Sequence, residues 1–247
     1  MPIRFVLASE LLKLKRAKLW LIMMCIPLIC IVLGLLNFQA NKEVLVHHGE
    51  NEWIKAWTQV GMLYSMFLLP ILIGIYSSLV CRSEFTGNNW NKLLSMPISI
   101  KNIYISKLIM IAFLSFITQI FLLAAYTLIG KLMGLPGFIP FTIIKWVFHG
   151  WIGTIAIASL QLLLSTSMKS FSVPVGVGVG FTFLGILLYL LKIGYIWPLS
   201  YPAIAMDPIH LKGLDNSFHL FLFYLASTFY ICTFSFIGIW RMEKRDI

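Results

Sequence analysis

The stretch CRSEFTGNNWNKLLSMPISIKNIYISKL, residues 81–108, is the longest polar passage in the middle of an otherwise apolar chain. A long apolar run lies on each side of it. The passage carries several charged side chains, yet Trp90, Leu93, Leu94 and Pro97 recur at helical spacing. The pattern predicts a short amphipathic helix between two hydrophobic segments.

Capping residues give this helix its expected limits. Thr86 is a suitable N-cap, and Pro97 ends the helix because proline cannot continue it. Ser99 can cap a second helix that continues into the next apolar run. Two interpretations stay open from the pattern: a helix that rests on lipid headgroups, or a helix that docks into a groove of a cytoplasmic partner.

The composition assigns the chain to the membrane. Of its 247 residues, 60% are hydrophobic and 11% are charged, whereas a soluble domain carries about 25% charged residues. We therefore expect an all-α integral membrane protein with a single transmembrane domain over residues 1–247. Six apolar runs predict six transmembrane helices, at about 19–38, 58–80, 104–129, 142–165, 173–191 and 218–240.

The first apolar run follows a basic segment, as a signal peptide would. The run Leu19–Phe38 is about 20 residues long, which exceeds a normal signal-peptide core, and no clean small-residue cleavage site follows it. We expect it to be retained as the first span. Residues 2–18 are either an interfacial helix or a solvated tail, because the apolar stripe of this segment is weak.

The basic residues predict the orientation of the chain. With the N-terminus inside, thirteen of the nineteen Lys and Arg residues fall in cytoplasmic segments. The positive-inside rule then places both termini and residues 81–103 in the cytoplasm. Residues 39–57 and 192–217 become external, and the prolines of the second loop predict short re-entrant or interfacial helices between spans five and six.

The charges and cysteines exclude several classes of function. None of the nine acidic residues lies in a predicted span, whereas ion-coupled transporters place ionisable groups near mid-membrane. The energy for any transport is therefore expected to come from elsewhere. The net charge of +10 is spread between apolar runs, so no nucleic acid partner is expected. The four cysteines show neither a disulfide framework nor metal-ligand spacing.

The external loop at 39–57 is a candidate contact for substrate. Its carboxylates Glu50 and Glu52 and its indoles Trp53 and Trp57 could attract a cationic amphipathic peptide, and a plain exposed loop is the alternative. No metal ligand set and no catalytic residue is predicted. A Ser159–His149 pair, the basis of a rival intramembrane enzyme, is not excluded by the sequence. Elsewhere, the glycines of VPVGVGVGF (173–181) predict close helix packing at Gly176 and Gly180.

Several short motifs resemble a known family. Glu84, Gly87, Trp90, LLSMPIS (93–99) and Ser106-Lys107 are similar to the first cytoplasmic loop of ABC type 2 exporter permeases. The stretches WIKAWTQ (53–59), FLLPILIGI (67–75) and NNWNKLLSMPISIKNIYISK (88–107) further resemble the permease subunits of lantibiotic self-immunity transporters. The six-span layout agrees with this family over nearly the whole chain.

The resemblance implies how work is divided between subunits. It makes residues 86–97 a coupling helix that docks a cytoplasmic ABC ATPase, with Trp90, Leu93, Leu94 and Pro97 as docking residues. Glu84 is expected to hold the segment by pairing with a basic group, either of this chain or of the ATPase. The chain has no G-x-x-x-x-G-K-[ST] loop, so ATP and Mg²⁺ are expected on that partner and no cofactor on this chain.

The resemblance also implies the assembly and its substrate. Two ATPase copies and a second permease, related to this chain but different from it, would complete an exporter in the bacterial cell membrane. Its implied role is to expel a lantibiotic-like antimicrobial peptide and so give immunity or resistance. Another amphipathic or lipid-soluble substrate, and a non-transporting membrane sensor or scaffold, stay open.

Overall fold

The computed structural model describes residues 3–15, 19–85, 98–168 and 170–244. Within those ranges every regular element is helical, and six helices are long and apolar enough to cross a membrane, as predicted. The six spans are Leu19–Ala40, Glu52–Arg82, Ile100–Leu132, Phe141–Ser167, Ser172–Leu190 and Ser217–Glu243. In chain order the elements are α1 (Ile3–Lys15), α2 (Leu19–Ala40), α3 (Lys42–Leu45), α4 (Glu52–Gly61), η1 (Met62–Leu68), α5 (Leu69–Phe85), α7 (Ile100–Leu132), α8 (Phe141–Ser167), α9 (Ser172–Leu190), η2 (Gly194–Ile196), η3 (Pro198–Ser200), α10 (Tyr201–Met206) and α11 (Ser217–Glu243).

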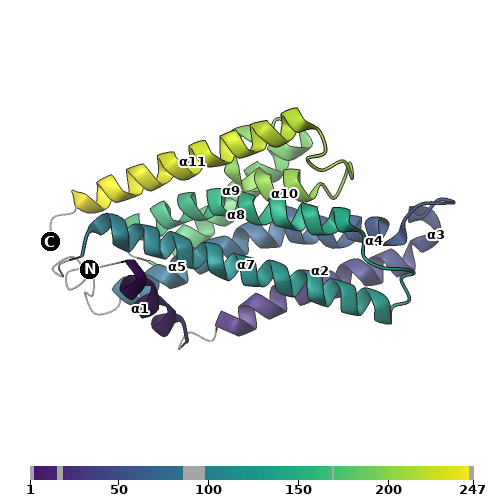
Figure 1. Ribbon diagram of the computed structural model, residues 1–247, viewed down its shortest axis with the longest axis horizontal. Helices are drawn as coiled ribbons and strands as arrows, with labels where there is room; N and C mark the ends of the chain where they lie inside the picture. The colour runs from purple at the N-terminus through teal and green to yellow at the C-terminus, as the bar shows by residue number, and fades with distance from the viewer. Residues whose placement is uncertain (1–2, 16–18, 86–97, 169, 245–247) are drawn as a thin grey trace.

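The helices form an elongated bundle with two distinct ends (Figure 1). At one end, here called the α1 end, lie α1, the last turn of α5, the start of α7 and the last turn of α11. The opposite end, here called the α3 end, carries α3, the start of α4 and the α7–α8 connection. Helix α8 packs against α5, α7, α10 and α11 and is central to the bundle. The assignment of the α1 end to the cytoplasm stays a prediction.

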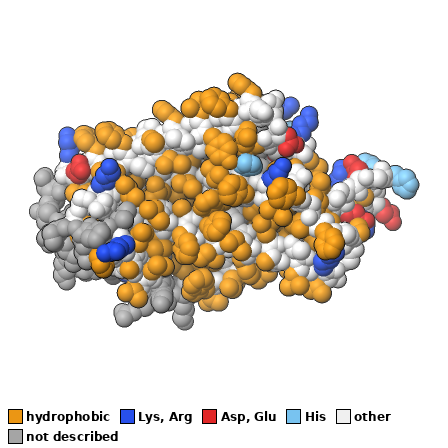
Figure 2. Space-filling view, in the orientation of Figure 1, with side chains coloured by type: hydrophobic (Ala, Val, Ile, Leu, Met, Phe, Trp, Pro, Cys, Tyr) orange, Lys and Arg blue, Asp and Glu red, His pale blue; other side chains and the backbone are white. Residues whose placement is uncertain are grey.

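The outer surface is apolar along the length of the bundle. Figure 2 shows hydrophobic side chains over most of the visible face, with charged groups gathered toward the two ends. Helix α11 contributes exposed rings such as Phe229 and Phe236. Such a surface is incompatible with water and suits the hydrocarbon core of a bilayer. The chain is therefore a multi-pass membrane protein.

Local signals explain where several helices begin. The Ser99 side chain accepts a hydrogen bond from the Asn102 N–H and caps α7, as the sequence predicted. Asn51 caps α4 and Asn216 caps α11 in the same way. The interiors of the spans need no such signals, because every backbone group in a bilayer must be paired within its own helix.

The second span is a composite of two α-helices and a π-helix between them. Between α4 and α5, residues Met62–Leu68 form a π-helix, η1, in which the Leu69 N–H bonds to the Tyr64 carbonyl. Pro70 follows and has no N–H to donate, so the ordinary hydrogen-bond ladder is already interrupted at this point. The π-helix points Tyr64 at α7, where its hydroxyl donates to Gln119 Oε1 at 3.1 Å.

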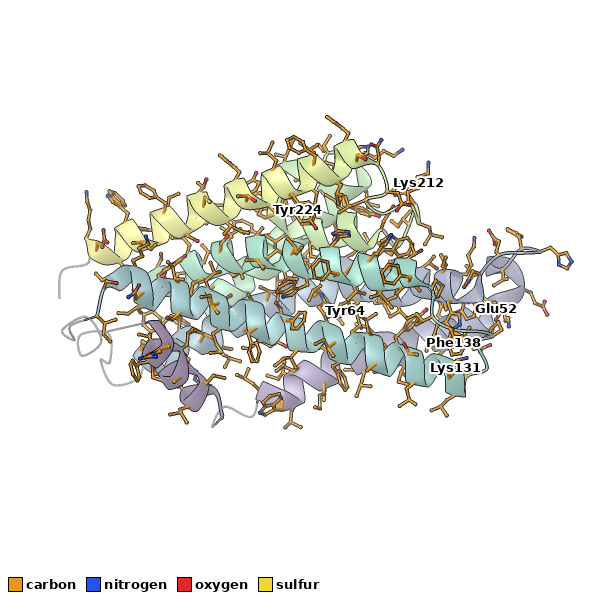
Figure 3. The ribbon with its side chains drawn as sticks, viewed as in Figure 1. Glu52, Tyr64, Lys131, Phe138, Lys212 and Tyr224 are labelled. Carbon is orange, nitrogen blue, oxygen red and sulfur yellow. The ribbon has the colours of Figure 1, made fainter. Side chains whose placement is uncertain are left out.

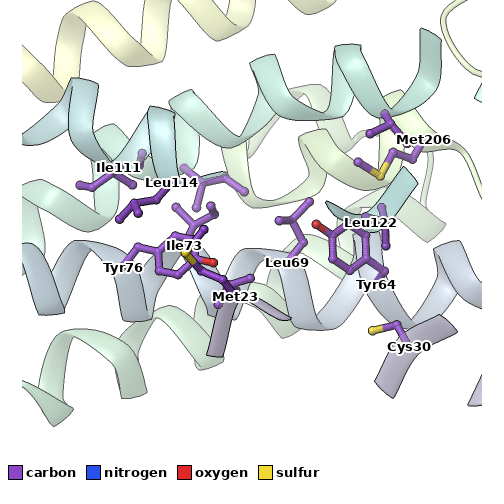
Figure 4. Packing of buried hydrophobic residues seen from close by; sticks show 14 of the residues in the cluster. Met23, Cys30, Tyr64, Leu69, Ile73, Tyr76, Ile111, Leu114, Leu122 and Met206 are labelled. Atoms are coloured by element: carbon purple, nitrogen blue, oxygen red, sulfur yellow. The ribbon is translucent and has the colours of Figure 1, made fainter. Parts of the chain in front are cut away.

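The core between the spans combines apolar packing with short polar contacts. Figure 4 shows Tyr64, Leu69, Ile73 and Tyr76 of span two packed in one cluster with apolar residues of α7. Within this core the Tyr76 hydroxyl is 2.8 Å from Thr118 Oγ1. Polar contacts of this kind are worth about 1 kcal/mol or less each in a membrane bundle.

The region between α9 and α11 is built from short helices. Two 3₁₀ turns, η2 and η3, lead into α10, which packs against α8. Asp207 ends α10 in the left-handed conformation (φ 31°). Its carboxylate accepts hydrogen bonds from the Tyr189 hydroxyl (2.7 Å) and from the backbone N–H groups of Lys212 (3.0 Å) and Gly213 (2.9 Å). Short helices were predicted here; their re-entrant character and external position stay predictions.

The glycine positions show which helix faces meet. A Cβ built on Gly178 of α9 would lie 2.1 Å from Gln161 Nε2 of α8, so this glycine makes the close contact. Gly176 and Gly180 have no heavy atom within 4 Å of such a Cβ, so no helix of the described chain packs on them. The predicted close packing of α9 is therefore correct in kind but falls on Gly178, which lies on the opposite face of the helix.

The closest backbone contact gives a first testable prediction. A Cβ built on Gly34 of α2 would lie 2.7 Å from the Val60 Cα and N atoms of α4. We expect Gly34→Ala to lower the stability of the detergent-solubilised protein by about 1–3 kcal/mol, because the helices must separate to admit a methyl group. Thermal unfolding measures this effect. Gly176→Ala is the matched control and should not lower stability; equal behaviour of the two variants would contradict the packing.

Candidate functional site

The site that the sequence singles out lies at the α1 end of the bundle. Helix α5 ends at Phe85 and helix α7 begins at Ile100, so both flanks of the 81–108 stretch are helical and lie at this end. The predicted docking residues Trp90, Leu93, Leu94 and Pro97 lie outside the described residues. Their helix and its docking role therefore stay predictions, and the site is built from its flanks.

A cluster of four charged side chains lies between these flanks and α1. It consists of Glu10 and Lys13 of α1, Glu84 of α5 and Lys107 of α7, and is called here the ion cluster. Lys107 Nζ lies 3.2 Å from both carboxylate oxygens of Glu10 and 2.9 Å from Glu84 Oε1. Lys13 Nζ lies 2.9 Å from Glu10 Oε1 and 2.7 Å from Glu84 Oε1.

The ion cluster is almost fully removed from solvent. Lys107 is 0% exposed and Glu10 and Glu84 are each 2% exposed, whereas Lys13 is 36% exposed at the edge. Lys107 also donates to the Val80 carbonyl at 3.0 Å, which joins it to the α5 backbone. A charge can be buried in this way only when it is paired and hydrogen-bonded, because its desolvation costs several kcal/mol.

The helical geometry of each element brings the four groups together. Glu10 and Lys13 are three residues apart on α1 and therefore share one face of that helix. Glu84 lies in the last turn of α5, and Lys107 lies two turns into α7 on its buried side. Helix α1 packs against α7 and α5, so this face meets both partners.

Glu84 has two cationic partners in the ion cluster. The sequence predicts that this carboxylate pairs with a basic group of this chain or of the ATPase, and it pairs with Lys107 and Lys13 of this chain. Its contribution to ATPase docking stays a prediction. The involvement of Glu10 was missed, although a lone acidic residue in a basic segment ahead of the first span, in a chain with only nine acidic residues, is a signal that it has a buried partner.

The second candidate set lies at the α3 end, where Figure 3 shows Glu52 together with Lys131 and Phe138. Glu50 pairs with Lys55 at 2.8 Å and accepts the His47 N–H at 2.9 Å. The Lys55 ammonium group, followed by the His47 N–H, holds the pKa of Glu50 below its ordinary value. Both contacts favour the charged carboxylate.

The two tryptophans of this set point inward instead. Trp53 is 1% exposed and Trp57 is 0% exposed. Their rings meet Tyr126 edge to face at centroid distances of 5.6 and 5.5 Å, and their indole N–H groups donate to the carbonyls of Pro136 (2.7 Å) and Met206 (3.1 Å). The structure therefore does not bring these indoles to the surface beside Glu50 and Glu52. They tie α4 to the α7–α8 connection and to α10.

The residues of the rival enzyme interpretation are not brought together. Ser159 Oγ donates to the Ala156 carbonyl of its own helix at 2.7 Å, and His149 Nδ1 lies 2.8 Å from the Tyr224 hydroxyl of α11. Both residues lie on α8, ten positions apart, which separates them by about 15 Å along the helix axis. This distance excludes a direct Ser–His dyad in the described structure.

Comparison with models of known protein families gives a match. The family model described as ABC-2 family transporter protein matches residues 6–185, which include the ion cluster, the 81–108 stretch and most of the first five spans. A search of curated proteins returned no match. The match covers well over half of the chain, and the six-helix membrane bundle agrees with it. The chain therefore belongs to the ABC-2 family of transporter proteins, as a membrane permease of an ABC transporter.

Proposed function

We propose that this permease is part of an exporter that removes a cationic amphipathic antimicrobial peptide, lantibiotic-like in its chemistry, from the bacterial cell membrane. The observation that carries the proposal is the ABC-2 family match across the 81–108 stretch. An ABC-2 permease pairs with an ATPase subunit, and residues 86–97 are the proposed docking segment. The resemblance of the stretches at 53–59, 67–75 and 88–107 to lantibiotic self-immunity permeases supports the choice of substrate.

The proposed assembly has two permeases and two ATPase subunits. ATP and Mg²⁺ bind between the ATPase subunits, because this chain carries no phosphate-binding loop. The second permease is a related but different chain. Closure of the ATPase pair around ATP moves the segment at 86–97, and the two permeases then rock against each other and open a path from the bilayer to the outside.

The acidic loop at the α3 end is the proposed first contact for the peptide. Glu50 is 35% exposed and negatively charged at neutral pH, and Glu52 at the start of α4 pairs with Lys42 at 2.7 Å. Long-range attraction of a cationic peptide by such a loop raises the rate of encounter and weakens as salt increases. Trp53 and Trp57 support this loop from inside rather than contacting the peptide.

The proposal predicts ATP-dependent release of a fluorescent cationic amphipathic peptide from membrane vesicles that contain the complete complex. A complex whose ATPase cannot hydrolyse ATP should release none. Glu50→Gln with Glu52→Gln should slow release severalfold at low salt and have little effect at high salt. Because the pKa of Glu50 is lowered, its contribution should persist at acidic pH and disappear only when the pH falls through that lowered value.

The outcomes separate the candidate functions. Release of lipid-soluble dyes but not of peptide would contradict a peptide substrate and favour an exporter of lipid-soluble compounds. Equal protection of cells by the wild-type and the ATPase-inactive complexes would contradict export and favour a sensor or scaffold that only sequesters peptide.

A further inference from the structure

The ion cluster joins α1 to the two helices, α5 and α7, that flank residues 86–97. Glu84 is the penultimate residue of α5, two positions before residues 86–97 begin, and Lys107 lies two turns into α7, ten positions after they end. Glu10 and Lys13 contribute from α1, a helix at the very start of the chain. The sequence separations from Lys107 to Glu10 and to Glu84 are 97 and 23 residues. The contacts of Lys107 therefore join different helices, whereas Glu10 and Lys13 also pair within α1.

Because the ion cluster is buried, it restricts how α1, α5 and α7 can move relative to one another. Pairs exposed on a surface can separate at little cost, because water replaces each partner. Lys107 is 0% exposed and its two carboxylate partners are 2% exposed, so separating them without solvation would leave unpaired charges in a low-dielectric site. The low-energy arrangement keeps α1, the end of α5 and the start of α7 in fixed positions relative to one another.

Stability alone does not require charged residues at these positions. Apolar side chains of similar volume usually hold helices together as well as a buried ion pair does, or better. What charged groups add is a directional contact that tolerates few alternative packings. The positive and negative charges of the four side chains are equal in number, with two ammonium groups and two carboxylates. Exchanging a lysine of the cluster with a glutamate of the cluster therefore preserves its total charge.

We propose that the ion cluster makes α1 and the facing ends of α5 and α7 a single rigid unit, which moves as a whole when the ATPase acts on residues 86–97. Lys107 is its positioning residue, because it contacts both carboxylates and the α5 backbone. This inference rests on the proposed function of the segment. Without the cluster, movement of the segment would separate the ends of α5 and α7 from α1 instead of carrying α1 with them, and ATP would be hydrolysed with less transport.

The test measures distances between spin labels in the purified permease and in its complex with the ATPase. One label replaces Leu12, which is exposed on α1, and the second replaces Lys101, which is exposed on α7. A reference pair joins position 12 to position 236 on α11, where Phe236 is 72% exposed. In the complex trapped with ATP and vanadate, the 12–236 distance should change and the 12–101 distance should not.

Charge exchange supplies the matched variants. Glu10→Lys or Lys107→Glu alone unbalances the cluster by two charges, and should broaden the 12–101 distribution both in the permease alone and in the complex. The double variant Glu10→Lys with Lys107→Glu restores two cations and two anions, but its carboxylate at position 107 faces Glu84 and the Val80 carbonyl, so the 12–101 distribution should narrow only in part. Peptide released per ATP hydrolysed should fall by about 2- to 30-fold in the single variants, the range of measured coupling effects, and should recover in part in the double variant.

Each result has a defined meaning. Unchanged 12–101 distributions in both single variants, or a 12–101 distance that changes with ATP in the wild type, would overturn the rigid unit. A wild-type complex that assembles but shows no change in the 12–236 distance would contradict its movement. Failure of the permease to bind any ATPase would instead contradict the proposed function, and the distributions in the permease alone would still report whether the cluster fixes α1.

Discussion

Lys107→Met is expected to destabilise the α1 end of the bundle by about 3–5 kcal/mol, the usual cost of breaking a buried ion pair by removing one partner. The methionine fills a similar volume but leaves Glu10 and Glu84 with Lys13 as their remaining partner in the cluster. Within the ion cluster, two buried carboxylates then face a single ammonium group, that of Lys13. Thermal unfolding in detergent should shift downward, and backbone amides of α1 should exchange with solvent much faster.

Two controls separate charge from packing. Lys101→Met lies on the same helix at an exposed position and should have little effect. The triple variant Lys107→Met, Glu10→Gln, Glu84→Gln removes the three buried charges of the cluster. It leaves only Lys13, which is 36% exposed, so it should regain much of the lost stability. Unchanged exchange in α1 of the Lys107→Met protein would show that the cluster does not hold this helix.

Trp90→Asp combined with Leu94→Asp is expected to abolish co-purification of the ATPase subunit. Anchoring residues of an interface commonly cost 2 kcal/mol or more each when their apolar contact is lost, so two together weaken binding by about a thousandfold. Carboxylates in a desolvated groove add a further penalty. The measurement is the amount of ATPase retained on the tagged permease after solubilisation.

The neighbouring asparagines provide a control for this prediction. Asn88→Asp with Asn91→Asp adds the same charge to the same segment, on the face that the pattern predicts to be polar. These substitutions should leave co-purification near the wild-type level. If both double variants lose the ATPase equally, the loss comes from charge in the segment and not from the predicted docking face.

The spans were predictable because they depend on local composition. A run of apolar residues long enough to cross a bilayer must be helical there, so hydropathy alone located all six. The start of α7 at Ile100 followed from Ser99, whose side chain caps its own helix and needs no distant partner. In contrast, the π-helix at Met62–Leu68 was not predicted, since the sequence marks the interruption at Pro70 but not the hydrogen-bond pattern that results.

Features that depend on which face of a helix packs against a neighbouring helix were less predictable. Gly176 and Gly180 matched a packing pattern, yet the helix that faces α9 meets Gly178. Trp53 and Trp57 lie in a loop of carboxylates, and this pattern indicates a contact with substrate at the surface. In the structure the two indoles instead pack against the buried ring of Tyr126 on α7. In each case the deciding residue lies on another helix, which periodicity along one segment does not reveal.

The ion cluster shows the same limit most clearly. The sequence indicated that Glu84 needed a basic partner, but Lys107 was only one of several cations in the same stretch. The choice among them depends on α1, the helix that precedes the first span, which brings Glu10 and Lys13 to the site. The docking helix itself was predicted from spacing and resemblance and lies outside the described residues.

The central claim is that residues 86–97 face the cytoplasm, where an ATPase can reach them. Asn91→Cys, in a protein whose exposed Cys25 and Cys232 are replaced by serine, allows a direct measurement with a thiol reagent that cannot cross membranes. His48→Cys at the α3 end serves as the external control. We expect intact cells to label position 48 only, and permeabilised cells to label position 91 as well. Labelling of position 91 in intact cells would contradict the topology and with it the coupling of this permease to an ATPase.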